Sequence, residues 1–426
     1  MKVAAGLVAV LSLAACGGGG GGTEPSGENQ AQESKTLRVW LMNGSAPEAL
    51  VTKVNQQFES THKGYKVKYE VQEWNGIQDK LTTALASKTP PDVVELGNTQ
   101  TPAFSSEAVL AELDQYKDKL NADKWLEGLA ATGVWEDKIY ATPFYAANRV
   151  VAYRTDLFDK AGLKPPTTFD EWVETGKALR AKNKNIKDFT PLYTAGQNWY
   201  AQLSFIWDNG GEIAVKEGET WKATLDTPEA QKGFENYKTL FTELGSPLSP
   251  ADRDEGTPQQ FELFAKGNIG MMISAPWEIG SAVGANKKLE GKVSAFSIPG
   301  QSGPAPVFLG GSNLAVPAGS ANVDAAADWL SLMLSDETQK ELASTNKVVP
   351  GVTGLGDLSG GDPIVQAMLT SSQNGKVTPA DPRWASVEAG TNPIKEAMTA
   401  VLSGSKPVDA ATKDASTGIS EALNAS

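Results

Sequence analysis

The sequence predicts an α/β protein of more than one domain, whose first hundred residues form part of a doubly wound parallel sheet. Two observations lead to this fold class. The chain has 426 residues, whereas a single core usually holds about 100–200 residues. Strand-like and helix-like segments also alternate over the first hundred residues, in the order of parallel strands joined by crossover helices. With 40% hydrophobic and 21% charged residues, the composition is that of a globular protein.

The beginning of the chain has the pattern of an export signal. Lys2 supplies a basic start, and residues 3–13 are apolar but too short to remain a membrane-spanning helix. The run Leu-Ala-Ala before Cys16 resembles the lipobox of bacterial lipoproteins, in which the cysteine thiol is diacylated and the chain is cut before it. We expect residues 1–15 to be a signal peptide and Cys16 to carry the lipid. An ordinary signal peptide with an incidental cysteine is the alternative.

Residues 16–35 are expected to form a flexible tether. Six consecutive glycines, residues 17–22, are followed by polar residues without periodicity, and such a segment cannot bury enough apolar area to fold. The glycines also match a phosphate-loop pattern, but no strand precedes them and no helix follows them. No later segment reaches about 20 apolar residues, so we expect no transmembrane helix beyond the signal.

The first elements of the folded part follow from hydrophobic spacing. Residues 36–41 are strand formers that end at an Asn-Gly-Ser turn, and residues 65–71 alternate along a second strand. Residues 47–60 and 77–87 carry apolar side chains at helical spacing. Residues 92–96 form a short apolar run, which is typical of a buried parallel strand.

The regular alternation stops beyond residue 100. Residues 135–145 contain a turn and a return strand, and residues 150–153 are a further strand. A helix is expected to start at Thr168, whose hydroxyl would cap it while Glu171 completes a capping box three residues later. Mixed structure continues to about residue 273, and there is no internal repeat.

Few residues are available for catalysis or metal binding. Cys16 and His62 are the chain's one cysteine and one histidine, so neither a disulfide, nor a zinc cage, nor a Cys/His dyad can be built. His62 lies in Ser-Thr-His-Lys-Gly, which we interpret as an exposed helix end. The net charge of −13 repels phosphate backbones, so nucleic acid is not an expected partner. We expect no cofactor, no metal site and no catalytic residue.

Five segments together resemble the sugar-binding proteins of bacterial ABC importers, in the class that includes the maltose-binding protein. The resemblance covers nearly the whole chain after the tether and depends on the order and spacing of the segments. One of them, Ala275-Pro276-Trp277-Glu278, resembles the proline–tryptophan corner that presents an aromatic ring to the sugar. The other segments are residues 91–95, 143–158, 308–316 and 325–345.

The resemblance implies a two-lobed, periplasmic-binding-protein-like α/β fold with a cleft between the lobes. Because the chain of such proteins crosses between lobes more than once, each lobe is discontinuous. We expect lobe one at residues 36–146 and 314–358, lobe two at residues 147–307 and 359–426, and a hinge at residues 308–313. Ligands of open α/β sheets bind at the carboxyl ends of the strands, which both lobes would turn toward the cleft.

Tryptophan is the residue type that best fits a sugar site here, because flat rings cover the apolar faces of sugar rings. The chain has 11 tryptophans, and the resemblance places several in ligand-contacting loops. Trp277 is the leading candidate, followed by Trp384 with its neighbour Arg383, and by Trp74 and Trp199. Core packing is the alternative for all four tryptophans. Trp40, Trp172 and Trp329 lie inside strand or helix patterns and are expected in the core.

Polar candidates follow the predicted strands at the ends that would face the cleft. Turn chemistry is the alternative for each of them, since Asn, Ser and Gly also favour turns. The run from Glu95 to Gln100 lacks the aromatic and charged residues of the maltose-binding protein, and it is closer to actinobacterial proteins that bind chitobiose-type sugars. The candidate ligand contacts are Asn43, Ser45, Glu95, Asn98, Thr99, Gln100, Asn148, Glu278, Ser312 and Asn313.

The sequence therefore predicts a monomeric binding protein that closes on a di- or oligosaccharide and delivers it to ABC permease subunits. It would be extracytoplasmic and anchored by lipid to the outer face of the cell membrane. A glycosidase is the alternative from another class, because hydrolysis needs two carboxylates and Glu95, Glu278 and Asp208 are available. A binding protein of the same fold for a polyol, peptide or osmolyte is the third interpretation.

Overall fold

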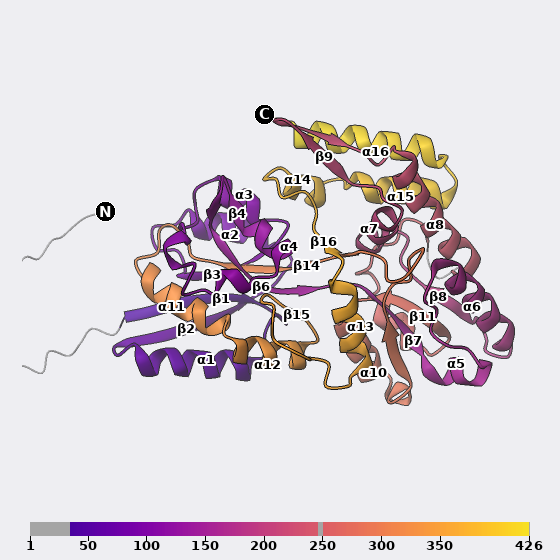
Figure 1. Cartoon of the computed structure of the whole chain (residues 1–426), viewed down its shortest axis with the longest axis horizontal. Coiled ribbons are helices and arrows are strands. Elements are labelled where there is room, and N and C mark those ends of the chain that lie inside the picture. The colour runs from indigo at the N-terminus through magenta and orange to yellow at the C-terminus, as the bar shows by residue number, and fades with distance from the viewer. Residues whose placement is uncertain (1–34, 246–249, 426) are drawn as a thin grey trace, which may run out of the picture.

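The computed structural model describes residues 35–245 and 250–425, which form two lobes side by side (Figure 1). The predicted signal peptide, Cys16 and almost all of the tether lie outside the described residues. Within the two described stretches, none of the helices combines the length and the apolar character needed to cross a membrane. The two-lobed α/β architecture agrees with the fold class that the sequence predicted.

A six-stranded mixed sheet forms the centre of the first lobe, in the order β15-β6-β14-β3-β1-β2. The predicted parallel part is confirmed, because β1 pairs in parallel with both β2 and β3. Beyond β3 the sheet becomes antiparallel, since β14 pairs antiparallel with β3 and with β6. The strands are β1 (Lys35–Met42), β2 (Tyr65–Gln72), β3 (Val93–Gly97), β6 (Ala141–Ala147), β14 (Gly310–Ala315) and β15 (Val349–Pro350). β2 forms one edge of this sheet.

Helices cover the lobe-one sheet with their apolar sides. In α1 (Glu48–Thr61), the buried residues Leu50, Val54 and Phe58 recur every four positions and join the core around β1, as the helical spacing predicted. The other α-helices of this lobe are α2 (Ile77–Leu85), α3 (Thr101–Ser106), α4 (Glu127–Ala130), α11 (Val323–Met333) and α12 (Asp336–Asn346). A short hairpin, β4 (Val134–Trp135) and β5 (Lys138–Ile139), precedes β6.

The second lobe has a four-stranded sheet in the order β12-β7-β11-β8. Its strands are β7 (Val150–Arg154), β8 (Thr190–Tyr193), β11 (Ile269–Ser274) and β12 (Val293–Phe296). The helices around it are α5 (Thr155–Ala161), α6 (Phe169–Lys182), α7 (Trp199–Asp208), α8 (Pro228–Leu244), α9 (Gln260–Phe264), α10 (Pro276–Ala285) and α13 (Pro363–Ser372). Trp172 is fully buried in its core, as expected.

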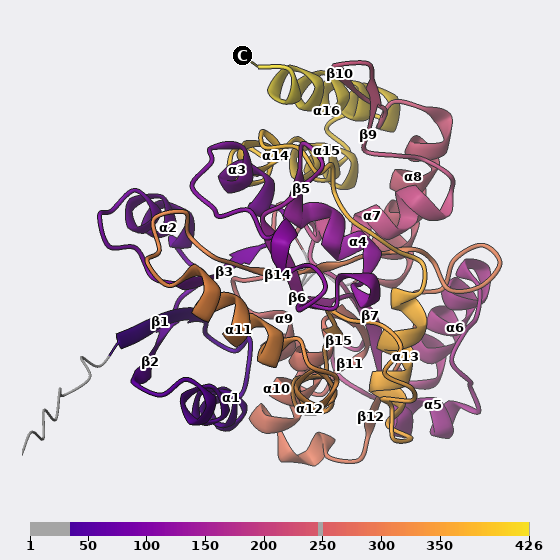
Figure 2. The same ribbon diagram turned by 60° about the vertical axis from the view of Figure 1, so that its left-hand side comes forward.

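The C-terminal helices gather at one end of the second lobe in both views (Figures 1 and 2). They are α14 (Trp384–Ala389), α15 (Pro393–Ser403) and α16 (Val408–Leu423). The hairpin of β9 (Ala214–Glu217) and β10 (Thr220–Ala223) packs on α16. α14 packs on α16 and lies on the side of this group that is nearer to the first lobe (Figure 1).

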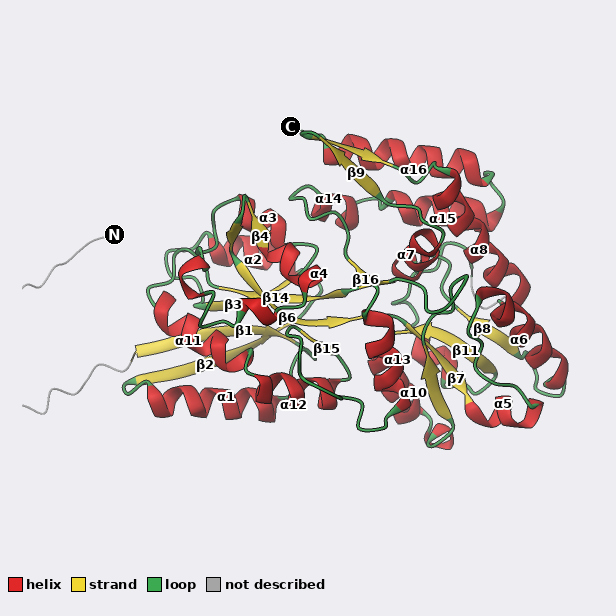
Figure 3. Ribbon diagram, in the orientation of Figure 1, coloured by secondary structure: helices red, strands yellow, loops and turns green. Residues whose placement is uncertain are grey.

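The chain passes between the lobes three times. The first crossing joins β6 to β7, and the second runs from β13 (Val307–Phe308) into β14. The third leads from β15 to α13. Figure 3 shows β6 and β14 extending side by side from the lobe-one sheet toward the second lobe. β13 pairs in parallel with β16 (Gly375–Lys376), so the second crossing is held by lobe two just before it enters the lobe-one sheet.

The start of α6 shows how local sequence sets an element boundary. The Thr168 hydroxyl accepts a hydrogen bond from the Glu171 amide at 3.3 Å, which confirms the predicted cap. The Glu171 carboxylate bonds the amide of Thr167 at 2.8 Å, one residue before the cap. In a capping box the Glu171 carboxylate would accept from the amide of the cap residue, Thr168, but here it accepts from the amide of the residue before it.

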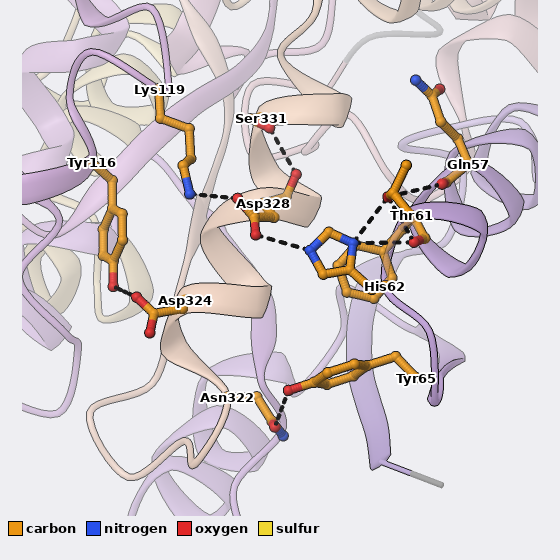
Figure 4. A network of polar contacts seen from close by, with 11 residues as sticks. Gln57, Thr61, His62, Tyr65, Tyr116, Lys119, Asn322, Asp324, Asp328 and Ser331 are labelled. Atoms are coloured by element: carbon orange, nitrogen blue, oxygen red, sulfur yellow. Dashed lines mark hydrogen bonds and ion pairs between the residues drawn. The ribbon is translucent and has the colours of Figure 1, made fainter. Parts of the chain in front are cut away.

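His62 lies at the end of α1, but the predicted solvent-exposed setting is wrong. Its ring stacks on Phe58, with centroids 4.1 Å apart and planes 9° apart. Its Nε2 lies 2.9 Å from a carboxylate oxygen of Asp328 on α11. Lys119 donates to the other carboxylate oxygen (Figure 4). His62 is thus a half-buried part of the contact between α1 and α11, and it lines neither of the cavities described below.

Candidate functional site

Two cavities lie between residues of the two lobes. The first, here called the Trp74 cavity, has a volume of about 290 Å³. The second, the Trp277 cavity, has a volume of about 650 Å³ and lies between α10 and the end of α12. The two approach each other at the end of β1, because Gly44 lines the Trp277 cavity while the adjacent Ser45 contacts Tyr145, which lines the Trp74 cavity. The Trp74 cavity is lined by Trp74, Gly97, Asn98, Thr99, Gln100, Tyr145, Ala147, Arg149, Tyr200, Phe308, Gly310, Gly311 and Glu388.

Each cavity contains one solvent-exposed tryptophan. Trp74, from the turn after β2, is 40% exposed, and Trp277, at the start of α10, is 50% exposed. Burial normally removes rings of this size from water. Two sequence-predicted rings, one on each lobe, therefore offer apolar surface to the space between the lobes.

Local structure fixes the position of Trp277. Pro276 occupies the first turn of α10, where its fixed φ suits a helix start. The Glu278 carboxylate accepts a hydrogen bond from the Ala275 amide at 2.8 Å and so caps the helix. The edge of Phe261 meets the Trp277 ring, with centroids 6.1 Å apart. Glu278 is therefore a buried support for the tryptophan and lines neither cavity.

Trp199 and Trp384 lie in the core of the second lobe. Both are buried, with ring centroids 6.4 Å apart, so they present almost no ring surface to either cavity. Arg383, beside Trp384, pairs with Asp381 at 2.8 Å, also outside both cavities. Trp384 is the first residue of α14 and packs into the core. Core packing, which was the alternative for this tryptophan, is therefore its observed position.

Tyr200, which the sequence reasoning missed, faces the Trp74 cavity in place of Trp199. It follows Trp199 by about 100° around α7, so one ring is buried while the other reaches the cavity. Its ring stacks on Phe308, with centroids 4.6 Å apart and planes 9° apart. The Arg149 guanidinium lies 5.4 Å from its centroid, and its hydroxyl donates to Glu388.

Arg149 and Glu388 bring charge to this cavity, and the sequence reasoning also missed them. Arg149 follows β6 at the first crossing and pairs with Glu255 at 2.6 Å. Glu388 lies four residues after the buried Trp384 on α14, which places it near the same side of that helix. Proximity to the predicted hinge could have indicated Arg149, but no local pattern distinguishes Glu388.

Three buried polar atoms of the Trp74 cavity have no hydrogen-bond partner within the described protein. They are Gln100 Oε1, Arg149 Nε and Glu388 Oε2. Buried polar atoms normally find partners, because leaving one unpaired costs about 1–3 kcal/mol. This cavity therefore holds two acceptors and one donor that are available to a polar ligand.

Glu95 lies beneath the cleft instead of lining it. The hydroxyls of Ser45 and Ser312 both donate to the same carboxylate oxygen of Glu95, each at 2.6 Å. The Met42 amide donates to the other carboxylate oxygen at 2.8 Å. Burial raises the pKa of the Glu95 carboxyl to about 7, although these hydrogen bonds oppose the shift. The predicted residues Ser45, Glu95 and Ser312 thus form one buried network that joins β1, β3 and β14.

The predicted asparagines also point into the protein. Asn98, Asn148 and Asn313 are buried, and each side-chain amide donates to an internal group: Leu309 O, Met368 O, and the hydroxyls of Thr101 and Thr132. Asn43 is exposed beside Glu73 but lines neither cavity. Of the predicted polar contacts, Asn98, Thr99 and Gln100 line the Trp74 cavity.

The carboxylates required by the glycosidase alternative are not gathered at either cavity. Glu95 and Glu278 are buried, and burial raises the pKa of Glu278 to about 7, where Arg149 opposes the shift. Asp208 accepts hydrogen bonds from the Gln301 amide, the closer at 2.9 Å. Among residues 35–245 and 250–425, no group of three or more His, Cys, Asp or Glu side chains is placed to hold a metal ion.

Comparison with known proteins gives consistent matches over most of the chain. Residues 43–340 match the family model of the bacterial extracellular solute-binding proteins. The diacetylchitobiose-binding protein DasA of Streptomyces coelicolor is 41% identical over 405 residues, which cover 94% of this chain and 93% of that protein. A maltooligosaccharide ABC transporter solute-binding lipoprotein of Streptococcus pneumoniae is 23% identical and covers 98% of this chain and 95% of the relative.

Solved structures share the fold. The sugar-binding protein MalE of Xanthomonas citri superposes with a TM-score of 0.79 at 21% identity, over 91% of this chain and 97% of that one. The GacH receptor of Streptomyces glaucescens gives a TM-score of 0.77 at 23% identity, over 92% and 99%. These similarities establish the two-lobed architecture.

Proposed function

We propose that this chain, which belongs to the family of bacterial extracellular solute-binding proteins, binds a di- or oligosaccharide between its lobes and delivers it to an ABC importer. The exposed pair Trp74 and Trp277 carries the proposal. Apolar ring faces combined with hydrogen-bonding edges are what a sugar requires of a binding site. One such ring on each lobe lets closure cover the ligand from two sides.

The ligand we favour is a sugar of the diacetylchitobiose class. The support is the 41% identity to a protein named for that ligand. The polar atoms of the Trp74 cavity also suit an acetamido sugar, whose amide group offers both an N–H donor and a carbonyl acceptor. Gln100 and Glu388 would accept, and Arg149 would donate.

The contact set we propose unites predicted and newly identified residues. It comprises Trp74, Thr99, Gln100, Tyr145, Arg149, Tyr200, Trp277 and Glu388. The buried Ser45, Glu95, Asn148, Glu278, Ser312 and Asn313 are proposed to support the cleft from behind, and Asn43, Trp199, Arg383 and Trp384 are left out of the contact set. In this arrangement the protein binds its ligand without transforming it.

We further propose that Cys16 anchors the protein to the outer face of the membrane through lipid, beside its permease partners. The support is the lipobox-like run before Cys16 and the glycine-rich segment after it. A monomer suffices, since both tryptophans come from one chain.

The test is a binding screen with purified protein, using diacetylchitobiose, maltose, cellobiose and mannitol. A ligand that binds only the folded state raises the melting temperature by mass action, and calorimetry would then give Kd. We expect the largest shift with diacetylchitobiose. If mannitol is the only compound that binds, the proposed ligand class changes from a sugar to a polyol. If monosaccharide is released from diacetylchitobiose on prolonged incubation, the binding-only role is refuted.

A further inference from the structure

The side chain of Asn98 extends the pairing between β3 and β14 beyond the end of β3. The Asn98 amide donates to Gly311 O at 3.0 Å, as the last backbone bond of the ladder. Its side chain then continues the pattern: Nδ2 donates to Leu309 O at 2.9 Å, and Oδ1 accepts from the Gly311 amide at 3.2 Å. An asparagine side chain carries the same donor and acceptor as a peptide group, so it stands in for the next residue of the strand.

Leu309 is consequently held from both lobes. Its carbonyl is bonded to Asn98 of lobe one, while its own amide donates to Lys376 O of lobe two at 2.8 Å. Its side chain is buried against Gly375, where an added Cβ would lie 2.4 Å from Leu309 Cγ. The neighbouring Gly311 is equally confined, because a Cβ there would lie 2.1 Å from Tyr145 O. Because lobe two holds the amide of Leu309 and lobe one holds its carbonyl, rotation between the lobes along this crossing is concentrated at the backbone torsions of Leu309.

We propose that Asn98 is a positioning residue that fixes the pivot of the second crossing and thereby sets the balance between open and closed lobes. The effect on affinity depends on the proposed function, in which the lobes close on a ligand. A ligand that binds one arrangement of the lobes has an apparent Kd equal to its intrinsic Kd divided by the populated fraction of that arrangement. In the absence of the Asn98 side chain, the Leu309 carbonyl and the Gly311 amide each lose a hydrogen bond to lobe one. The backbone of the second crossing can then adopt a wider range of torsion angles.

The experiment measures the distance between the lobes with spin labels. Labels are placed at Lys63→Cys on lobe one and Lys184→Cys on lobe two, both exposed sites, in a Cys16→Ser background that leaves no other thiol. Asn98→Ala removes both side-chain bonds, whereas Asn98→Asp keeps an acceptor for the Gly311 amide and loses the donor to Leu309 O. Asn43→Ala is the matched control, because Asn43 is an exposed asparagine of lobe one that lines neither cavity.

We expect Asn98→Ala to broaden the distance distribution of the unliganded protein, Asn98→Asp to give an intermediate width, and Asn43→Ala to leave the width unchanged. The Kd for diacetylchitobiose should rise about 3- to 30-fold in Asn98→Ala, the range expected from one or two lost hydrogen bonds. Unchanged distributions in folded Asn98 variants would overturn the proposal, and the Asp variant decides if the Ala variant does not fold. Because the unliganded distances involve no sugar, this outcome is independent of whether the proposed ligand is correct.

Discussion

Replacing Trp277 with alanine should weaken sugar binding by a factor that the exposure of its ring predicts. A tryptophan side chain buries about 150–250 Å² when fully covered. Trp277 is 50% exposed, so about 100 Å² remains for a ligand to cover. At about 25 cal/mol per Å², covering this area stabilises the complex by about 2.5 kcal/mol.

A sugar that stacks on one face covers only part of this area, so we expect Trp277→Ala to cost about 1.4–2.5 kcal/mol of binding free energy. That loss corresponds to a rise in Kd of about 10- to 60-fold. Isothermal titration calorimetry with diacetylchitobiose measures it directly. Trp277→Phe keeps an aromatic face and should lose much less.

Val215→Ala provides the matched control. Val215 is 37% exposed on β9 and lines neither cavity, so its truncation should leave Kd unchanged. If Trp277→Ala binds diacetylchitobiose as tightly as the unaltered protein, the ring is not a sugar contact and the area argument fails. A weakening in both variants would instead indicate an effect on the whole fold.

Three further predictions concern stability and location. The raised pKa of Glu95, about 7 against an ordinary 4.5, means that the fold favours the neutral carboxyl; its contribution is complete below pH 4.5 and is lost, by up to about 3 kcal/mol, as pH rises through 7. Glu95→Gln should therefore flatten the dependence of the unfolding free energy on pH between 5 and 8, measured with urea, while the exposed Glu290→Gln should not. Burial acts to raise the pKa of Asp328, but hydrogen bonds from Lys119 and His62 outweigh it and leave the pKa lowered; its stabilisation is present above the unfolded pKa and is lost as pH falls through the folded one. Asp328→Asn should accordingly lower the melting temperature at pH 7 by a few degrees and by progressively less as the pH falls through the acid range, and a loss that does not change with pH would contradict the ion-pair explanation. Cys16→Ser should move the protein from the membrane fraction to the medium, and continued membrane retention would exclude the lipid anchor.

Hydrophobic spacing was sufficient to predict much of the first lobe. The first five elements appear where the sequence placed them, and each boundary lies within two residues of the expected one. The reason is that the apolar side chains of an amphipathic helix or an apolar strand can be buried in only one orientation. The antiparallel half of the sheet could not be predicted in this way. β14 pairs with β3 although more than 200 residues separate them, and no local pattern specifies a pairing of that range.

The candidate site was predictable only in part, for a related reason. Sequence position indicates that a residue follows a strand, but the packing of the whole lobe decides which way its side chain points. Trp277 and Trp384 have similar local settings at helix starts, yet one is half exposed and the other is fully buried. Asn98 was predicted beside the cleft, and it lies there. Its side-chain hydrogen bonds, however, are made to Leu309 and Gly311, which are more than 200 residues away in the sequence.

The free edge of the lobe-one sheet has a consequence for self-association. β2, a strand of eight residues, pairs with β1 on one side and has no neighbouring strand on the other, and such an edge is a template for pairing with a second copy and hence for aggregation. Lys66 and Lys68 stand exposed along it, in ion pairs with Glu59 at 2.7 Å and Glu70 at 2.8 Å. The β2 strand of a second copy would bring its own lysines alongside them, so this edge disfavours self-association and helps each molecule to remain separate at high concentration.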